Sequence, residues 1–290
     1  MRNLRWLIFC FLLLLSSPYK ASSETKPLTL DFIYVGDGDS ILIQTPEFHS
    51  ILIDTGNLLS GFDVVEHLKL QGIRKLDALI LTHPHLDHIG GVFAAMRLFK
   101  VTKVFDNGEA QDGDGVYKDI SRWYRQLVRA DPNYEELYQA KELRFGDLKI
   151  RVLWPPKQRV YSDWNTNSLV LQLQYGAFKA LLMGDANKAT EKALIESKLI
   201  LDETLSLLKA GHHGAKDTAS VKFLKKSKAK IVLISSAIDS PKDYPDSRTL
   251  KRYQEHGATL FRTDEGGTIR FEAYPSGSLH VIQNGKIEVF

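Results

Sequence analysis

The sequence predicts an α/β (α+β) protein folded as a four-layer αββα sandwich, in which two sheets pack face to face beneath outer helices. Its 290 residues, 43% of them hydrophobic, are enough for one large domain with a substantial core. Short apolar stretches typical of strands alternate with helical patterns. Each half of the chain also leads to an apolar strand followed by histidines, at residues 79–83 and 207–214. Two such halves, placed face to face, would bring both histidine loops to one edge.

The first half begins with three expected strands, at residues 28–35, 40–44 and 50–53, separated by Gly-Asp turns and a loop at Pro46. A helix is expected at residues 62–70, because Val64, Val65, Leu68 and Leu70 are expected on one helical face. Apolar residues then predict a strand at 77–82, a helix from about residue 90, and a strand at 102–105.

The second half starts with a strand at residues 149–153, which ends before Pro155 and Pro156. A hairpin follows, with strands at 169–174 and 178–183 around a Tyr-Gly-Ala turn. The remaining pattern predicts a helix at 187–197, a strand at 205–210, a helix at 222–227, a strand at 231–235, a helix at 247–256, and strand structure to the end.

Residues 107–142 interrupt this alternation between the two halves. The stretch is polar and aromatic, is punctuated by Gly113, Gly115 and Pro132, and has a helical pattern at about 120–128. Long connections of this kind in compact domains are usually functional. We therefore predict an insertion over one face of the sandwich, which is a candidate lid or substrate loop.

The N-terminus has the composition of a secretory signal peptide. Residues 1–5 are basic, residues 6–15 form an apolar run too short to span a membrane, and small residues at 21–23 offer a cleavage site. The sequence thus predicts a signal peptide at 1–23 and one exported domain at 24–290, periplasmic or secreted, with no membrane span after cleavage. An uncleaved N-terminal anchor is the alternative.

Removing this leader would change both the charge and the cysteine content. Residues 1–23 hold the one cysteine, Cys10, and three of the 38 basic residues, but none of the 35 acidic residues. The remaining 35 basic and 35 acidic residues balance, so the apparent charge of +3 is no argument for a nucleic-acid partner. The exported domain would also have to fold without disulfide bonds.

Four metal-binding side chains lie within six residues: His83, His85, Asp87 and His88. They follow the apolar run 78–81, so they emerge from a buried strand into a tight loop. Imidazole nitrogens and carboxylate oxygens are the ligands that zinc and related divalent ions take. Without a cation, such a loop would carry a large desolvation cost. A chance cluster is the alternative, but metal sites are where such clusters normally occur.

Three aspartates occupy similar positions in other parts of the chain. Asp54 follows the strand at 51–53, Asp185 follows 181–184, and Asp39 closes a Gly-Asp-Gly turn. Each one alone is explained better by turn chemistry, since Asp and Gly favour turns. Together with two histidine loops, they favour a shared metal site at one sheet edge.

These motifs resemble the metallo-β-lactamase superfamily, for which the His-x-His-x-Asp-His loop is highly specific. Further segments make the chain similar to one branch, the hydrolase domain of the ComEC family of bacterial DNA-uptake proteins, without its membrane channel. These segments are residues 32–40, 51–56, 152–156, 167–171, 182–186 and 209–214. The resemblance covers residues 29 to about 272 and implies the metallo-β-lactamase fold.

The resemblance also implies two divalent ions, zinc or manganese, and roles for particular residues. His83 and His85 would hold one ion, and Asp87 and His88 the other. Asp185 would bridge both ions, and His212 or His213 would complete the second site, with His212 preferred. Asp54 would orient a ligand histidine through its other ring nitrogen, and Asp39 would line the same edge.

The chain departs from the superfamily pattern in three places. It has no histidine between Ile89 and Gly211, where many members supply another ligand, so Asn165, Asn167 or water would take that position. Tyr34 stands where relatives carry Asp, and Tyr244 stands where they carry a histidine. Tyr244 is therefore expected beside the substrate. Four further histidines, His49, His67, His256 and His280, are interpreted as surface residues.

The resulting functional prediction is an exported, metal-dependent phosphodiesterase or nuclease. A metal-bound hydroxide, oriented by Asp87 and Asp185, would attack a phosphodiester, either DNA or a cell-envelope polymer. Hydrolysis of carboxylic esters, lactones or β-lactams is the alternative within the same class. A non-catalytic binding protein on a metal scaffold is the alternative of another class. The sequence does not predict the oligomeric state.

Overall fold

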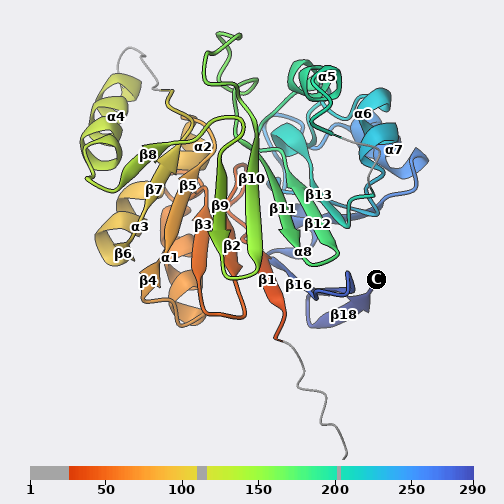
Figure 1. Cartoon of the computed structure of the whole chain (residues 1–290), viewed down its shortest axis with the longest axis horizontal. Coiled ribbons are helices and arrows are strands. Elements are labelled where there is room, and N and C mark those ends of the chain that lie inside the picture. The colour runs from red at the N-terminus through yellow and green to blue at the C-terminus, as the bar shows by residue number, and fades with distance from the viewer. Residues whose placement is uncertain (1–25, 110–115, 201–203) are drawn as a thin grey trace, which may run out of the picture.

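A computed structural model describes residues 26–109, 116–200 and 204–290, and it confirms the four-layer sandwich. A nine-stranded sheet and a seven-stranded sheet pack face to face, and helices cover the outer face of each (Figure 1). The predicted signal peptide lies outside the described residues. Within the described residues, no helix combines the length and the apolar character that crossing a bilayer requires.

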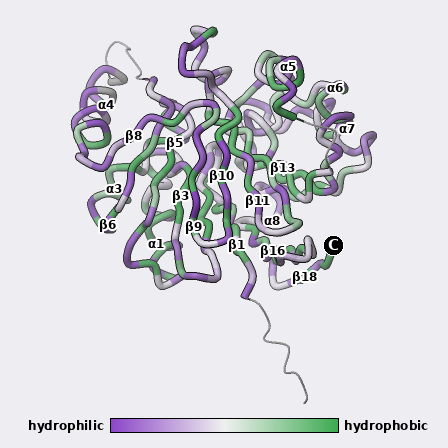
Figure 2. The backbone as a smooth tube through the Cα atoms, viewed as in Figure 1, coloured by the Kyte–Doolittle hydropathy of each residue, from purple (hydrophilic) through white to green (hydrophobic). Residues whose placement is uncertain are grey.

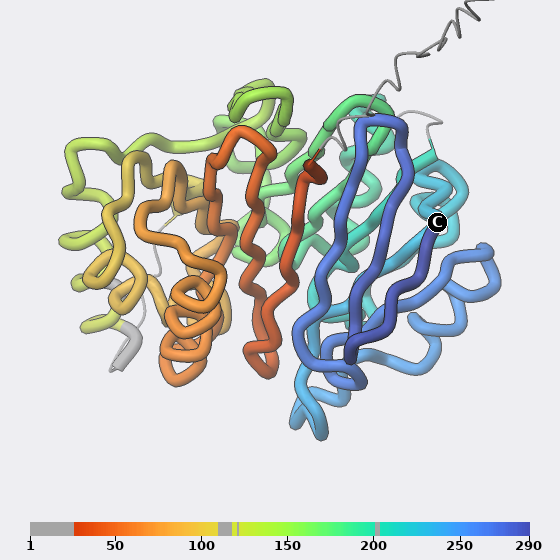
Figure 3. The backbone as a smooth tube through the Cα atoms, turned by 90° about the horizontal axis from the view of Figure 1, so that it is seen from below, coloured from red at the N-terminus to blue at the C-terminus, as the bar shows by residue number. Residues whose placement is uncertain are grey.

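The first sheet joins both ends of the described chain. Its strands, in spatial order, are β18 (Lys286–Val289), β17 (Leu279–Gln283), β16 (Ile269–Ala273), β1 (Leu28–Phe32), β2 (Ile41–Gln44), β3 (Ser50–Ile53), β5 (Ala78–Leu81), β7 (Val104–Asp106) and β8 (Tyr134–Glu136). β1 pairs antiparallel with β2 on one side and with β16 on the other, so the last three strands extend the sheet that the first strand starts (Figure 3).

The second sheet comes from the second half of the chain. Its order is β15 (Thr259–Arg262), β14 (Ile231–Ile234), β13 (Leu207–Lys209), β12 (Phe178–Leu182), β11 (Val170–Tyr175), β10 (Leu148–Trp154) and β9 (Glu142–Phe145). β12 to β15 are parallel, as are β3, β5 and β7 in the first sheet. The carboxyl ends of parallel strands share one edge, which is where α/β sheets bind ligands.

The helices divide between the two outer faces. On the first sheet lie α1 (Gly61–Leu70), the short α2 (Leu86–Ile89), α3 (Val92–Leu98), α4 (Val116–Tyr124) with the π-helical turn Arg125–Arg129, and the small pair β4 (Lys75–Leu76) and β6 (Lys100–Val101). On the second lie α5 (Lys188–Glu196), α6 (Val221–Ser227) and α7 (Ser247–Glu255). A 3-10 turn at Gly211–Gly214 and the short α8 (Thr263–Gly266) complete the elements.

Strands in the middle of the sandwich are buried on both faces, which explains their continuous apolar runs. In β2, Ile41 and Ile43 belong to the core between the sheets, whereas Leu42 belongs to the core beneath α1 and α3. A third apolar cluster lies between the second sheet and its helices. Figure 2 shows hydrophobic residues along the strands, while many connecting loops are hydrophilic.

The predicted insertion at 107–142 is partly built into the sandwich. β8 pairs parallel with β7 at the edge of the first sheet, and Leu137 is buried in the core between the sheets. α4 begins at Val116, before the predicted start of about 120. This segment therefore forms a sheet edge as well as a loop, and its role as a lid stays a prediction.

Candidate metal centre

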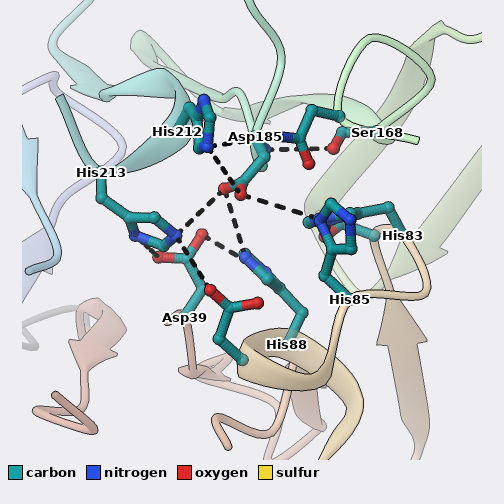
Figure 4. Close-up of polar contacts among 12 residues, drawn as sticks. Asp39, His83, His85, His88, Ser168, Asp185, His212 and His213 are labelled. Carbon is teal, nitrogen blue, oxygen red and sulfur yellow. Dashed lines mark hydrogen bonds and ion pairs between the residues drawn. The ribbon is translucent and has the colours of Figure 1, made fainter. Parts of the chain in front are cut away.

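Four chain segments from the two sheets converge on the segment that carries Asp185 (Figure 4). Asp185 follows β12, the first histidine segment follows β5, and the second histidine loop follows β13. Asp54 directly follows β3, and Asp39 lies just before β2. The predicted meeting of two distant histidine loops at one edge is therefore present in the fold.

Asp54 fixes the first histidine segment at both of its ends. Its carboxylate accepts hydrogen bonds from the Thr82 backbone N–H and hydroxyl, both at 2.7 Å, and from His88 Nδ1 at 2.8 Å. The short helix α2 begins after His85, so His88 lies in a helical turn rather than in the predicted loop. Because Nδ1 donates to Asp54, the Nε2 atom of His88 faces Asp185 and lies 3.2 Å from Oδ1.

His83 and His85 approach each other on the other side of Asp185. His83 Nε2 lies 2.9 Å from His85 Nδ1 and 3.7 Å from Asp185 Oδ2. Two atoms bound to one tetrahedral ion at about 2.0–2.1 Å would lie about 3.3 Å apart. The distances from His83 Nε2 to His85 Nδ1 and to Asp185 Oδ2 are both within a few tenths of an ångström of that value. Burial lowers the pKa of both imidazoles. Burial thus favours the neutral ring, which is the form that binds metal.

The second histidine loop has an unusual backbone. His212 and His213 have φ values of 45° and 53°, a left-handed conformation that non-glycine residues rarely adopt. Each such residue costs roughly 1–2 kcal/mol, and such strain is typical of functional sites. The turn directs both imidazoles at Asp185: His213 Nε2 lies 3.3 Å from Oδ1, and His212 Nε2 lies 4.0 Å from Oδ2.

The two oxygens of Asp185 therefore face different pairs of imidazoles. Oδ1 faces His88 and His213, whereas Oδ2 faces His83 and His212. His213 Nε2 also lies 4.0 Å from Asp87 Oδ2, and its Nδ1 donates to the Ser235 carbonyl at 3.0 Å. This arrangement favours His213, rather than the expected His212, as the partner of Asp87 and His88.

Unpaired buried atoms test whether this site fits cations. His88 Nε2, Asp185 Oδ1 and His213 Nε2 are buried, face one another and have no hydrogen-bond partner. Leaving such atoms unsatisfied costs about 1–3 kcal/mol each. In each of two groups of side chains, the ligand atoms lie within 4.8 Å of one another. These groups are His83, His88 and Asp185, and Asp87, His88 and His213. The donor set therefore fits divalent ions.

The charge balance of the site agrees with this fit. Burial lowers the pKa of His88, but Asp185 and Asp54 outweigh it and raise that pKa well above its ordinary value. Burial likewise raises the pKa of Asp185, but His213 and His88 hold it well below its ordinary value. The buried carboxylates thus attract positive charge, and a divalent ion can replace the proton of His88.

Lys209 is a buried residue beside the site that the sequence does not predict. Its side chain is fully buried, and its ammonium group contacts Asp39 and donates to the Gly184 carbonyl at 3.0 Å. Asp39 is therefore buried behind the site, 3.8 Å from His88 Nδ1 and 3.9 Å from His213 Nδ1. A lysine within the apolar strand β13 was the available signal, because buried lysines need a charged partner.

A cavity of about 500 Å³ opens above the cluster. Its lining residues are Asp37, Asn57, His85, Leu86, Asp87, Asn165, Asp185, His212 and Lys242.

Asn165 Nδ2 donates to His212 Nε2 at 3.1 Å, whereas Asn167 is buried and bound to Glu109 and the Tyr161 carbonyl. The Tyr244 hydroxyl lies 3.3 Å from His212 Nε2. Of the two asparagines expected near the site, Asn165 lines the cavity. A second cavity, of about 310 Å³, lies on the outer face of β10 to β12, and no group of metal-ligating side chains among the described residues lines it.

Comparison with known proteins gives a consistent result. The profile of the Metallo-beta-lactamase superfamily matches residues 33–237. ComE operon protein 3 of Bacillus subtilis (strain 168) is 29% identical over 261 residues, which cover 83% of this chain and 32% of that protein. Competence protein ComA of Neisseria gonorrhoeae is 29% identical over 237 residues, which cover 81% and 31%. The chain spans about a third of the length of these relatives.

Solved structures show the same fold at low identity. The metallo-beta-lactamase fold protein YhfI from Bacillus subtilis matches with a TM-score of 0.54 and 16% identity, over 85% of this chain and 100% of that chain. CmlA, a diiron beta-hydroxylase from Streptomyces venezuelae, matches with a TM-score of 0.54 and 13% identity, over 82% and 53%. Because the identities are so low, these matches support the fold and not a shared activity.

Proposed function

The chain belongs to the metallo-beta-lactamase superfamily, as its motifs predict, and from that premise we propose that it is an exported, metal-dependent hydrolase of phosphodiesters. The observation that carries the proposal is the division of the Asp185 carboxylate between two pairs of imidazoles. This division would let one carboxylate serve two ions in the same cavity. Relatives named for competence favour DNA as the phosphodiester, and a cell-envelope polymer is the other candidate.

We assign the two ion sites from the side of Asp185 on which each ligand lies. His83, His85 and Asp185 Oδ2 would hold the first ion. Asp87, His88, His213 and Asp185 Oδ1 would hold the second. His212 lies on the side of the first ion, where many superfamily members supply the additional histidine that this chain lacks between its two loops. Zinc and manganese both suit such ligands.

The protein would contribute mainly orientation to the reaction. Two divalent ions would supply a water molecule with a pKa of about 7 and would hold the attacking and leaving oxygens of the substrate. Asp87 and Asp185 would accept hydrogen bonds from that water and direct it at phosphorus. Asp54 keeps the His88 ring in its ligand orientation, and Asn165 presents its amide at the wall of the cavity.

Metal analysis combined with substrate assays tests the proposal. The full chain, loaded with zinc or with manganese, is assayed with bis-p-nitrophenyl phosphate, single-stranded DNA, nitrocefin and a thioester. We expect two ions per chain and turnover of the diester, with DNA cleaved as well if DNA is the substrate. Faster turnover of nitrocefin or the thioester than of the diester would instead favour the carbonyl alternatives. No turnover at full metal loading would favour a binding protein.

Export is tested separately, because it does not depend on the reaction. We expect the protein expressed with residues 1–23 to leave the cytoplasm, and mass spectrometry of the mature chain to find Glu24 at its N-terminus. A chain that remains membrane-bound with an intact N-terminus would identify residues 1–23 as an anchor.

A further inference from the structure

Lys242 brings a positive charge to the cavity above the predicted ion sites. Its Nζ lies 3.0 Å from Asp87 Oδ2. The Lys242 side chain is 48% exposed and that of Asp87 is 18% exposed, so the ammonium group lies between the carboxylate and solvent. The same Asp87 oxygen lies 4.0 Å from His213 Nε2, on the side of the proposed second ion.

The segment that carries Lys242, residues 237–246, is anchored at both ends. Asp37 accepts hydrogen bonds from the Ala237 backbone N–H at 3.2 Å and from the Ser240 hydroxyl at 2.9 Å. At the other end, the Asp246 backbone N–H donates to the Gly214 carbonyl at 3.0 Å. The segment therefore connects the loop before β2 with the second histidine loop, which holds the base of the Lys242 side chain in place.

Two tyrosines that the sequence singles out, Tyr34 and Tyr244, belong to or contact this segment. The Tyr34 hydroxyl accepts a hydrogen bond from the Ile238 backbone N–H at 3.4 Å. Tyr244 belongs to the segment, and its ring centre lies 5.9 Å from Lys242 Nζ. Tyr34 and Tyr244 thus both contact the segment that carries Lys242, the one lysine among the residues that line the cavity.

The contact between Lys242 and Asp87 cannot persist unchanged when Asp87 holds an ion. A divalent ion on this carboxylate would repel an ammonium group bound to the same oxygen. The lysine side chain is flexible and half exposed, so it can turn into the cavity. There it would meet the open ligand positions, where the phosphate of a substrate would bind.

The geometry points to Lys242 as a phosphate-binding residue: its ammonium group leaves Asp87 and donates to a non-bridging oxygen of the substrate phosphate. This inference rests on the proposed phosphodiesterase function, since it assigns a role toward that substrate. Ammonium–phosphate hydrogen bonds are among the stronger polar contacts in proteins. Lys242 would thereby favour phosphoryl substrates over uncharged esters at the same two metal ions.

Two Lys242 variants and one control test this role in the metal-loaded full chain. Lys242→Met removes the charge and Lys242→Arg keeps it, while Lys251→Met removes an exposed lysine on α7, away from the cavity. The measurements are metal affinity, calorimetric binding of inorganic phosphate, and KM and kcat for bis-p-nitrophenyl phosphate. Because Lys242 is half exposed, neither variant is expected to unfold the protein.

We expect Lys242→Met to weaken phosphate binding and to raise KM by about 10- to 100-fold, which equals about 1.4 kcal/mol per tenfold change. Its metal affinity should stay the same or increase. Lys251→Met should match the wild type, and Lys242→Arg, which keeps the charge, should lose less phosphate affinity than Lys242→Met. Unchanged phosphate affinity in Lys242→Met would overturn the inference, as would weaker metal binding, which would make Lys242 a positioning residue for Asp87. Phosphate binding needs no turnover, so its result stands even if the wild type does not hydrolyse the diester.

Discussion

Asp106 and Asp185 are both buried carboxylates at the carboxyl end of a strand, but their surroundings differ. They are 2% and 1% exposed. Asp106 accepts hydrogen bonds from the Tyr124 and Tyr134 hydroxyls at 3.0 and 2.6 Å, from the Gly108 backbone N–H and from Arg129 Nε. Asp185 Oδ1 instead faces two imidazoles and has no hydrogen-bond partner.

This difference separates a structural carboxylate from a candidate ligand. These four donors to Asp106 all come from the predicted insertion at 107–142. The imidazoles of His88 and His213 are oriented by hydrogen bonds through Nδ1, so their Nε2 atoms face the carboxylate. A buried carboxylate and imidazole nitrogens that face one another need a proton or a metal cation between them. Position at a strand end therefore identifies a metal ligand only together with the orientation of its neighbours.

The largest effect is expected from changing Asp185, whose Oδ1 has no hydrogen-bond partner. Asp185→Asn keeps the size of the side chain but removes the charge between the two pairs of imidazoles. We expect diesterase activity to fall by about 10³-fold or more, because a group that orients the reacting atoms is lost. The bound metal per chain should also fall, while circular dichroism stays unchanged. Turnover that survives with both ions bound would contradict the role assigned to this carboxylate.

The matched variant at Asp106, whose carboxylate accepts hydrogen bonds from other groups of the protein, should lose stability but not activity. Asp106→Asn leaves Arg129 with a neutral partner in a buried network, which typically costs about 3–5 kcal/mol of stability. We expect urea unfolding to detect this loss, while activity per folded molecule stays close to that of the wild type. A large loss of metal content in folded Asp106→Asn would show that the two carboxylates are not independent.

Metal removal gives the next effect in size. An ion that binds only the folded chain stabilises it by about 2.7 kcal/mol when its free concentration is 100 times Kd. We expect a chelator to lower the free energy of unfolding of the wild type and of Asp106→Asn by similar amounts. Asp185→Asn should respond less, because part of its binding site is already lost. Equal responses of all three proteins would argue against ions at Asp185.

The sequence predicted those parts of the site whose residues are contiguous. The histidine segment after β5 is recognisable because its four ligands lie within six residues of an apolar strand. The carboxylates Asp54 and Asp185 are recognisable because each follows such a strand. The choice between His212 and His213 was beyond the sequence, since it depends on two consecutive left-handed residues.

Contacts between distant segments were also beyond the sequence. β16 to β18 join the first sheet through a pairing with β1 that no local pattern specifies. The burial of Lys209 is not predictable, because a charged residue in a strand is usually exposed. Its partner Asp39 is 170 residues away in the sequence but lies beside it in the fold. Residues 107–142 were interpreted as a lid from their composition, which could not reveal that Tyr134–Glu136 pairs with β7.

Asp31 provides a smaller and pH-dependent test of the same comparison. Its carboxylate, 1% exposed on β1, accepts hydrogen bonds from Arg270 at 2.6 Å and from His67 at 2.8 Å. His67 was expected at the surface, but it is mostly buried against this carboxylate. Burial raises the pKa of Asp31, but these partners outweigh it and hold the pKa below its ordinary value. Like Asp106, Asp31 accepts its hydrogen bonds from other groups of the protein.

Asp31 should therefore affect stability and not metal binding. A carboxyl group whose pKa is lower in the folded state adds stability above its unfolded pKa of about 3.9, and this stability is lost as pH falls through the folded value. We expect Asp31→Asn to cost roughly 1.5–3 kcal/mol at neutral pH, with metal content unchanged. The stability difference between wild type and variant should shrink below about pH 4. A difference that stays constant on acidification would mean that the charge of Asp31 contributes nothing and that the loss reflects packing alone.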